Sequence, residues 1–202
     1  MARVRIGAPE TVVFQTTRDD AMAMAGPTDE DLMLAARRGD RDAFARLVER
    51  HQSRVWALAS RFLQDRTEAE DVAQQAFLRI LEAAPRYEPS ARFTTYLYGV
   101  VKRLCMDHAE KRRPRVTDDL EATASAPSPA DAAALQEQED LVRRALARLP
   151  ENQRMAVLLR HYEGLGYREI AGVLETTEKA VERLLARARD SLEGLLAKVW
   201  QT

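Results

Sequence analysis

The chain is short of the residues that cross-link small proteins or bind metals in them. Its single cysteine, Cys105, lies within an apolar helical pattern, and one cysteine can form neither an internal disulfide nor a zinc-binding cluster. The three histidines, His51, His108 and His161, are far apart in the sequence and have no cysteine or carboxylate set at ligand spacing. We therefore expect no metal site and a reducing environment.

Long apolar runs are missing as well. No segment approaches the roughly 18 apolar residues that a membrane-spanning helix requires, and residues 1–15 lack the continuous apolar core of a signal peptide. The sequence therefore predicts a cytoplasmic protein without membrane insertion.

Neither enzyme motifs nor an excess charge of one sign is present. Nothing resembles a nucleophile elbow, a phosphate-binding glycine loop or a pair of catalytic carboxylates, so we predict no enzymatic activity and no cofactor. Lys and Arg total 31 against 32 Asp and Glu, which excludes a uniformly basic nucleic-acid-binding protein. Any contact with DNA must come from local basic patches.

Helical periodicity is what the sequence has in abundance. Between Phe44 and Phe62 apolar residues recur at three- and four-residue steps, and no stretch alternates with period two over the length of a strand. The predicted fold class is therefore all-α. At 202 residues, two small helical domains joined by a linker are a better fit than one domain.

Composition sets the predicted domain boundaries. Residues 1–28 show no sustained periodicity and are expected to form a flexible tail. Residues 29–114 form the first predicted domain, and residues 139–202 form the second. Between Val116 and Asp140 there are seven acidic residues and no basic ones, a composition that buries little apolar surface and predicts a flexible linker over residues 115–138.

Capping residues indicate where helices of the first domain begin. Gly39 is suited to close one helix and Asp40 to cap the next. Thr67 and Glu70 match a capping box. The helix that follows is predicted to continue to Pro85, with Phe77, Ile80 and Leu81 on its apolar stripe.

The second domain carries the pattern of a helix-turn-helix. A short amphipathic helix, Tyr167 to Leu174, is followed by a tight connection and a second helix that begins at Thr177, its predicted cap. The outward residues predicted to reach base edges are Glu178, Lys179, Glu182 and Arg183, with Arg187 and Arg189 placed for phosphates. An ordinary helical hairpin with a solvated charged face would show the same spacing.

The helix predicted from Phe93 to Arg113 has an aromatic start and a basic end. Phe93, Tyr96 and Tyr98 are followed by Lys102, Arg103, Lys111, Arg112 and Arg113. Rings that stack on bases and cations that hold the backbone suit single-stranded DNA. Alternatively, the aromatic rings belong to the core, and the basic residues simply favour the negative end of the helix dipole.

The helix before it has a polar face. The exposed side is predicted to carry Glu68, Glu70, Asp71, Gln74, Gln75 and Arg79. This face is suited to docking a protein partner, although a solvated surface would have the same composition.

Taken in order, these motifs resemble one family. The segments are Asp42-Ala43-Phe44 to Tyr87, Thr67 to Arg79, Phe93 to Asp107-His108, the acidic linker, Leu149 to Arg154, Tyr167 to Ala171 and Ala186 to Arg189. Their order and spacing over residues 29–198 are similar to those of the extracytoplasmic-function (ECF) sigma factors of bacteria.

The resemblance implies an alternative-type sigma factor, with domains called regions 2 and 4. The implied partners are promoter DNA and RNA polymerase core, through the clamp helices of its largest subunit and the flap of its second-largest subunit. An anti-sigma factor is a further implied partner. The implied core-binding residues are Glu70, Asp71, Gln74, Gln75, Phe77 and Arg79.

The same resemblance implies two DNA sites. The residues that would melt and read the minus-10 element are Tyr96, Lys102, Arg103, Asp107, His108, Lys111, Arg112 and Arg113. Those that would read the minus-35 duplex are Arg168, Thr177, Glu178, Lys179, Glu182, Arg183, Arg187 and Arg189.

Five residues depart from the family pattern. Tyr96 stands where Trp is frequent, Arg103 where Asn is frequent, and Glu182 and Leu184 where many members have basic residues. Glu175 replaces a common turn glycine, and because a left-handed backbone favours glycine, this connection is expected to take another conformation.

Two other functions remain alternatives at this point. A dimeric helix-turn-helix regulator acting without core polymerase would explain the second domain, and a helical adaptor would require no DNA. Neither accounts for the whole ordered series of motifs.

Overall fold

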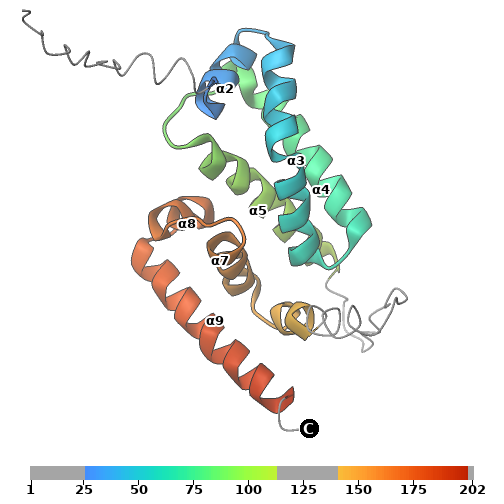
Figure 1. Cartoon of the computed structure of the whole chain (residues 1–202), viewed down its shortest axis with the longest axis vertical. Coiled ribbons are helices and arrows are strands. Elements are labelled where there is room, and N and C mark those ends of the chain that lie inside the picture. Colours follow the sequence, from blue (N-terminus) through green and yellow to red (C-terminus); the bar gives the residue numbers. More distant parts are fainter. Residues whose placement is uncertain (1–25, 113–140, 200–202) are drawn as a thin grey trace, which may run out of the picture.

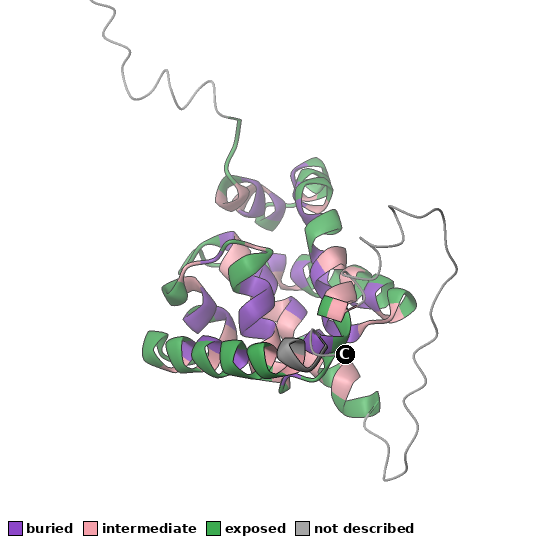
Figure 2. Cartoon of the chain, turned by 60° about the horizontal axis from the view of Figure 1, so that its bottom comes forward, coloured by how far each residue is buried: buried purple, intermediate pink, exposed green. Residues whose placement is uncertain are grey.

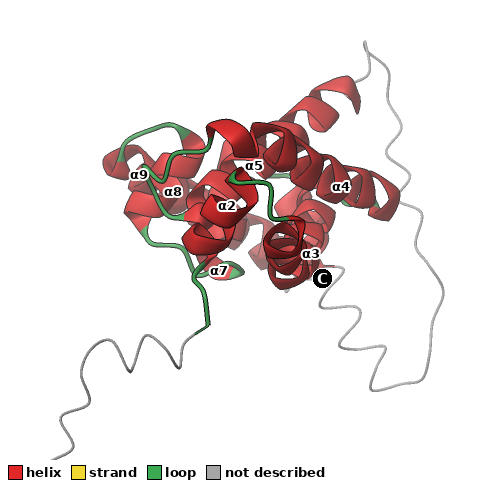
Figure 3. Ribbon diagram, turned by 90° about the horizontal axis from the view of Figure 1, so that it is seen from above, coloured by secondary structure: helices red, strands yellow, loops and turns green. Residues whose placement is uncertain are grey.

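The computed structural model describes residues 26–112 and 141–199 (Figure 1). Within these ranges every regular element is a helix (Figure 3), which confirms the all-α prediction. The predicted tail up to residue 25, the predicted linker and Arg113 lie outside the described residues.

The first two helices begin at well-formed caps. Helix α2 (Asp29–Arg37) begins after Thr28, whose hydroxyl accepts from the amide of Asp31 in a capping box. Helix α3 (Arg41–Leu63) begins after Asp40, whose carboxylate accepts from the amide of Ala43 at 3.0 Å. Gly39 has φ +94°, so the predicted helix stop and cap at Gly39 and Asp40 are confirmed.

The predicted start of the next helix was wrong by two residues. Helix α4 (Arg66–Ala83) is capped by Asp65, whose carboxylate accepts from the amide of Glu68 at 3.0 Å, so Thr67 lies inside the helix. A 3-10 turn, η1 (Ala84–Arg86), contains Pro85, which cannot donate the amide hydrogen that a longer α-helix would use. Helix α5 (Phe93–Arg112) follows.

Helices α2 to α5 form the N-terminal helical group. Helix α3 packs against α2, α4 and α5, with Leu47, Leu58 and Phe62 fully buried. Burying side chains of this size stabilises a fold by about 1.5–3 kcal/mol each. Leu81 was predicted to face this core but is 44% exposed, because it lies beside the buried stripe that ends at Ile80.

The C-terminal helical group comprises the helical segment 141–147 and three further helices. These are α7 (Glu151–His161), α8 (Tyr167–Leu174) and α9 (Glu178–Val199). The run Met155 to Leu159 in α7 is buried on all sides, because α8, α9 and the N-terminal group surround it.

The two helical groups contact each other directly. Helix α5 packs along α8, and α3 packs against α7, so that buried residues of both groups form one continuous apolar cluster. Figure 1 shows α5 between the remaining N-terminal helices and α8, and Figure 2 shows the buried residues on the helix sides that face one another.

Candidate nucleic-acid interface

The C-terminal group contains the predicted helix-turn-helix. Helix α8 has the predicted bounds, and Ala171, Val173, Val181 and Leu185 are buried in its packing with α9. Thr177 caps α9, since its hydroxyl accepts from the amide of Ala180 at 3.2 Å.

The turn between these helices contradicts one expectation. Glu175 adopts the left-handed conformation, with φ 55° and ψ 46°, although a different conformation was expected in the absence of glycine. The amide of Thr176 donates to the carbonyl oxygen of Ala171 at 2.9 Å and closes the end of α8. These cap hydrogen bonds offset the steric cost of a left-handed side chain, so the usual turn geometry is kept.

The outer face of α9 is exposed and carries charge in rows. Lys179, Arg183 and Arg187 recur every four residues and therefore share one helix side. Glu178 and Glu182 form a neighbouring acidic row. The remaining predicted minus-35 residues, Arg168 on α8 and Arg189 on α9, are exposed as well.

Helix α5 brings together only part of the predicted minus-10 site. Arg103, Asp107 and Lys111 are exposed, Lys102 and His108 are half-buried, and Tyr96 packs its ring 5.6 Å from that of Tyr87. Arg112 is already used within the fold, where it donates to the carbonyl oxygen of Leu63 at 2.9 Å and pairs with Glu68 at 3.2 Å.

The aromatic start of α5 is mostly core. Phe93 is fully buried and Tyr98 is 2% exposed, so neither ring can stack on a base in this arrangement. Burial raises the pKa of Tyr98, and so does its hydrogen bond to Glu163, which keeps the phenol protonated as the donor to that carboxylate. For these two rings the alternative interpretation, as core residues, is the correct one.

The candidate partner-docking face lies on α4. Glu70, Asp71, Gln74, Gln75 and Arg79 are all exposed there, whereas Phe77 is 7% exposed and supports the helix from beneath. Leu78 and Leu81, which were not among the predicted residues, are 58% and 44% exposed on the same helix. Helical spacing alone did not show that these two leucines are exposed within the polar face.

Charged side chains connect the two helical groups in a way the sequence did not predict. Arg103 donates to Glu175 at 2.7 Å, and Lys102 lies 4.0 Å from the same carboxylate. These cations lower the pKa of Glu175, the hydrogen bond from Arg103 having the largest effect. A residue of the candidate minus-10 site is therefore bound to the turn of the helix-turn-helix.

Arg154 is a second residue that sequence reasoning did not assign to a site. Its guanidinium donates to the carbonyl oxygen of Phe62 in α3 at 2.8 Å and to that of Ala147 at 2.6 Å. Burial lowers the pKa of Arg154. Arg154 directly precedes the apolar run Met155 to Leu159, and this position next to a buried run is the sequence signal for such a contact.

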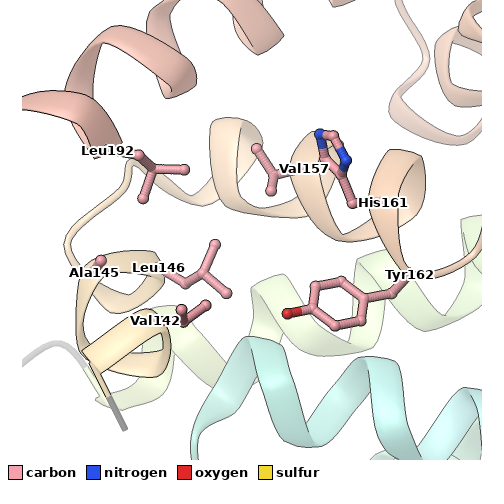
Figure 4. Close-up of a pocket in the computed structure, with 7 residues that line it drawn as sticks. All are labelled: Val142, Ala145, Leu146, Val157, His161, Tyr162 and Leu192. Carbon is pink, nitrogen blue, oxygen red and sulfur yellow. The ribbon is translucent and has the colours of Figure 1, made fainter. Parts of the chain in front are cut away.

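An apolar hollow of about 200 Å³ opens on the C-terminal group (Figure 4). Val142 and Leu146 line it from one side, Val157 and Tyr162 from α7 and its end, and Leu192 from α9. Val142 and Tyr162 are each 42% exposed, which leaves room for an apolar side chain of a partner.

The described residues contain no cluster of His, Cys, Asp and Glu that could hold a metal ion. Among the described residues, no helix has both the length and the apolar character needed to cross a membrane. What the arrangement offers is binding surfaces: a helix-turn-helix with a basic row, a helix with a cationic side, a polar face with exposed leucines and an apolar hollow.

Family models match both helical groups. The model described as Sigma-70 region 2 matches residues 47–115, and the model described as Sigma-70, region 4 matches residues 139–192. The RNA polymerase sigma-H factor of Pseudomonas aeruginosa is 34% identical over 180 residues, which cover 83% of this chain and 93% of that protein. The ECF RNA polymerase sigma-E factor of Escherichia coli K12 is 30% identical over 179 residues, with the same coverage.

Solved structures share the fold. CnrH, in complex with the cytosolic domain of CnrY, superposes with a TM-score of 0.68 at 28% identity, covering 84% of this chain and 97% of CnrH. The sigma factor RpoE of Bartonella quintana, in complex with the anti-sigma factor NepR, has a TM-score of 0.62 at 21% identity and covers 76% of this chain.

Proposed function

The chain belongs to the sigma-70 family, among its ECF sigma factors, and from that premise we propose how its surfaces divide the work of promoter recognition. As a sigma factor it directs promoter-specific transcription initiation by RNA polymerase core. Its role is that of a non-enzymatic initiation factor. The division among residues, the domain bounds and the further partners are our proposals.

The proposed core-binding surface is the outer face of α4. Glu70, Asp71, Gln74, Gln75 and Arg79 supply polar contacts to the clamp helices of the largest subunit, with Leu78 and Leu81 added as apolar contacts. Interfaces of this kind combine an apolar centre with a polar rim. Phe77 acts from beneath, because it is buried against the core of the N-terminal group.

The proposed minus-35 surface is the outer side of α8 and α9. A helix-turn-helix places the first turns of its second helix in the major groove, where Lys179, Glu182 and Arg183 reach base edges. Arg168, Arg187 and Arg189 then hold phosphates. The exposed basic row of α9 is the observation that carries this part of the proposal.

The proposed minus-10 surface is α5. Lys102, Arg103 and Lys111 hold the backbone of the opened strand, Asp107 and His108 lie between them, and Tyr96 supplies a half-buried ring. Arg112 takes part only if its bonds to Leu63 and Glu68 open.

The proposed domains are residues 29–114 as region 2 and residues 139–202 as region 4, joined by residues 115–138. The apolar hollow between the segment 141–147, α7 and α9 is proposed to receive the flap of the second-largest subunit. An anti-sigma factor is proposed as a further partner, because CnrH and RpoE were solved bound to CnrY and NepR. We propose that the protein acts in the cytoplasm, because the sigma factors to which it is similar act there with RNA polymerase.

Run-off transcription with purified bacterial core polymerase tests this function. Genomic fragments compete as templates, and reactions without the protein serve as controls. Discrete start sites that depend on the protein are expected, with matched sequence elements upstream of them. Absence of protein-dependent transcripts, together with absence of binding to core, would contradict the sigma function. That result would favour a regulator that acts without core, or an adaptor.

A further inference from the structure

The loop that leads into α5 is held at both ends by side chains of one other helix. At its first end, Nη1 of Arg37 in α2 donates to the carbonyl oxygen of Tyr87 at 2.9 Å. At its second end, the amide of Phe93, the first residue of α5, donates to Oε1 of Glu30 in α2 at 2.7 Å. Between these two points residues 88–92 are all exposed. We call Glu30 and Arg37 the α2 anchors.

The hydrogen bond to Glu30 replaces a cap that α5 lacks in its own sequence. The first amides of an α-helix have no acceptor within the helix, and a Ser, Thr, Asp or Asn just before the helix usually supplies one. The residue before α5 is Arg92, whose guanidinium donates hydrogen bonds and cannot accept them. The carboxylate of Glu30, 63 positions away in the sequence, therefore takes the place of the local cap.

The α2 anchors lie on one side of a helix that is itself fixed to the core. They are seven residues apart, which is close to two helical turns, so both side chains lie on the same side of α2, about 10 Å apart along its axis. Leu32 and Met33 are buried in the core of the N-terminal group, and Asp29 lies 2.7 Å from Nε2 of His51 in α3. Helix α2 can therefore support both ends of the loop at a fixed separation.

The ring that α5 offers to the opened DNA strand lies beside both held ends. The ring centroid of Tyr96 lies 5.6 Å from that of Tyr87 and 6.4 Å from that of Phe93. The α2 anchors hold the backbone of these same two residues. A displacement of either end of the loop would therefore move a ring that packs beside Tyr96.

We propose that the α2 anchors are positioning residues for the minus-10 surface: they hold the start of α5, and with it Tyr96, in the orientation that reads the opened strand. They act through α5 and need not touch DNA themselves. A surface that is ordered before its ligand arrives binds more tightly and more selectively, because ordering it during binding costs free energy. This inference rests on the proposed minus-10 role of α5, and it adds α2, a helix with no residue in the proposed core-binding or DNA surfaces.

The test compares two double variants of the full chain, each assembled with core polymerase. Glu30→Ala with Arg37→Ala removes both anchors. Glu49→Ala with Arg38→Ala is the matched control, because it also removes one glutamate and one arginine, both of them exposed. The promoter is one found with the wild-type protein in run-off transcription.

The measured quantity is the discrimination ratio at that promoter. It is the amount of run-off transcript from the native template divided by the amount from a template with one base changed in the minus-10 element. The changed base is the one whose substitution lowers transcription by the wild-type protein most. A smaller folded fraction lowers both transcripts by the same factor, so a merely structural defect leaves the ratio unchanged.

We expect the discrimination ratio to be at least about threefold lower in the anchor variant than in the control, a change of the size that loss of one hydrogen bond produces in an equilibrium. Among single variants, Glu30→Ala should lower the ratio. Glu30→Gln keeps an oxygen acceptor for the amide of Phe93 and should keep the wild-type ratio.

Amide hydrogen exchange, measured by mass spectrometry, tests the anchoring without polymerase. The peptide that contains Phe93 should exchange faster in Glu30→Ala than in the wild-type protein, because its amide loses its acceptor and the start of α5 opens more often. Exchange in Glu30→Gln should match the wild-type protein.

An unchanged discrimination ratio in the anchor variant would overturn the inference, as would equal exchange in Glu30→Ala and the wild-type protein. Tyr96→Ala separates this failure from failure of the minus-10 surface. If Tyr96→Ala lowers the ratio and the anchor variant does not, α5 reads the element and the α2 anchors do not position it. If Tyr96→Ala also leaves the ratio at the wild-type value, the proposed role of Tyr96 is wrong, and the inference fails with it.

Discussion

Burial decides the chemistry of the one cysteine. Cys105 is fully buried in α5, and burial raises the pKa of its thiol to about 12. Because the thiolate is the reactive form, a thiol with this pKa reacts slowly at neutral pH.

Cys105 should therefore resist alkylation until the N-terminal group opens. We expect iodoacetamide at pH 8 to leave the folded protein unmodified over a time in which the protein in denaturant is fully labelled. Mass spectrometry measures the modification. Equally fast labelling in both states would mean that α5 is not held against the core.

Glu175 shows how residue type can mislead about backbone conformation. The absence of a turn glycine suggested another connection, yet the residue takes the left-handed conformation. Its neighbours favour this outcome, because the cap bonds of α8 and the pair with Arg103 are both made in this geometry. Arg103 and Glu175, both of which depart from the family pattern, are partners of each other.

At the scale of single elements, the start of α4 is the clearest case. Thr67 was the predicted cap because it matches a capping box with Glu70, but the hydrogen-bond geometry assigns the cap to Asp65. The structure uses Asp65, which satisfies the amide of Glu68.

Alanine substitutions test this cap directly. Asp65→Ala should lower the free energy of unfolding by about 1 kcal/mol, because a free amide at the start of α4 loses its acceptor. Thr67→Ala, inside the helix, should change it by less than about half of that, since alanine has the higher helix propensity. Urea denaturation of both variants measures the difference, and a larger loss for Thr67→Ala would reverse the assignment.

The face of α4 also shows where helical periodicity stops being informative. Leu78 and Leu81 share the helix with the buried Ile80, and spacing alone placed Leu81 inside. Neighbouring helices cover only one side of α4, and these two leucines lie outside the covered side.

At the scale of the whole molecule, substitutions on different surfaces should weaken different binding activities. Asp71→Ala is expected to weaken binding to core polymerase by about 1 kcal/mol through loss of a surface contact. Arg183→Ala should weaken minus-35 duplex binding by about 1–3 kcal/mol and leave core affinity intact. Quantitative binding of both variants to core and to duplex DNA measures the separation.

Phe77→Ala is the control for indirect effects. Loss of this buried ring should cost about 3–5 kcal/mol of folding free energy by leaving a cavity, and core binding should fall with the folded fraction. Equal loss of core binding in all three variants would contradict the division of labour.

Acid should weaken the contact between the helical groups. The hydrogen bond and the charge of Arg103, followed by the charge of Lys102, lower the pKa of Glu175, so the packed arrangement of the two helical groups prefers the ionised carboxylate. The stabilisation is therefore present above pH 4.5 and is lost as the pH falls through the lowered pKa. Small-angle X-ray scattering should show that the radius of gyration increases between pH 5.5 and 3.5, and that it increases less in Glu175→Gln. The same pH dependence of the radius in both proteins would contradict this role of Glu175.

The sequence by itself determined the helices, the helix-turn-helix and the exposed row on α9, because periodicity, caps and turn residues act over a few neighbouring positions. Only the tertiary structure decided that Phe93 and Tyr98 are core, that Leu78 and Leu81 are surface, and that Arg103 meets Glu175. These outcomes depend on which helices pack together, and the last of them joins residues that are 72 positions apart. Local sequence patterns do not predict such long-range contacts, because these contacts form only when the whole chain is folded.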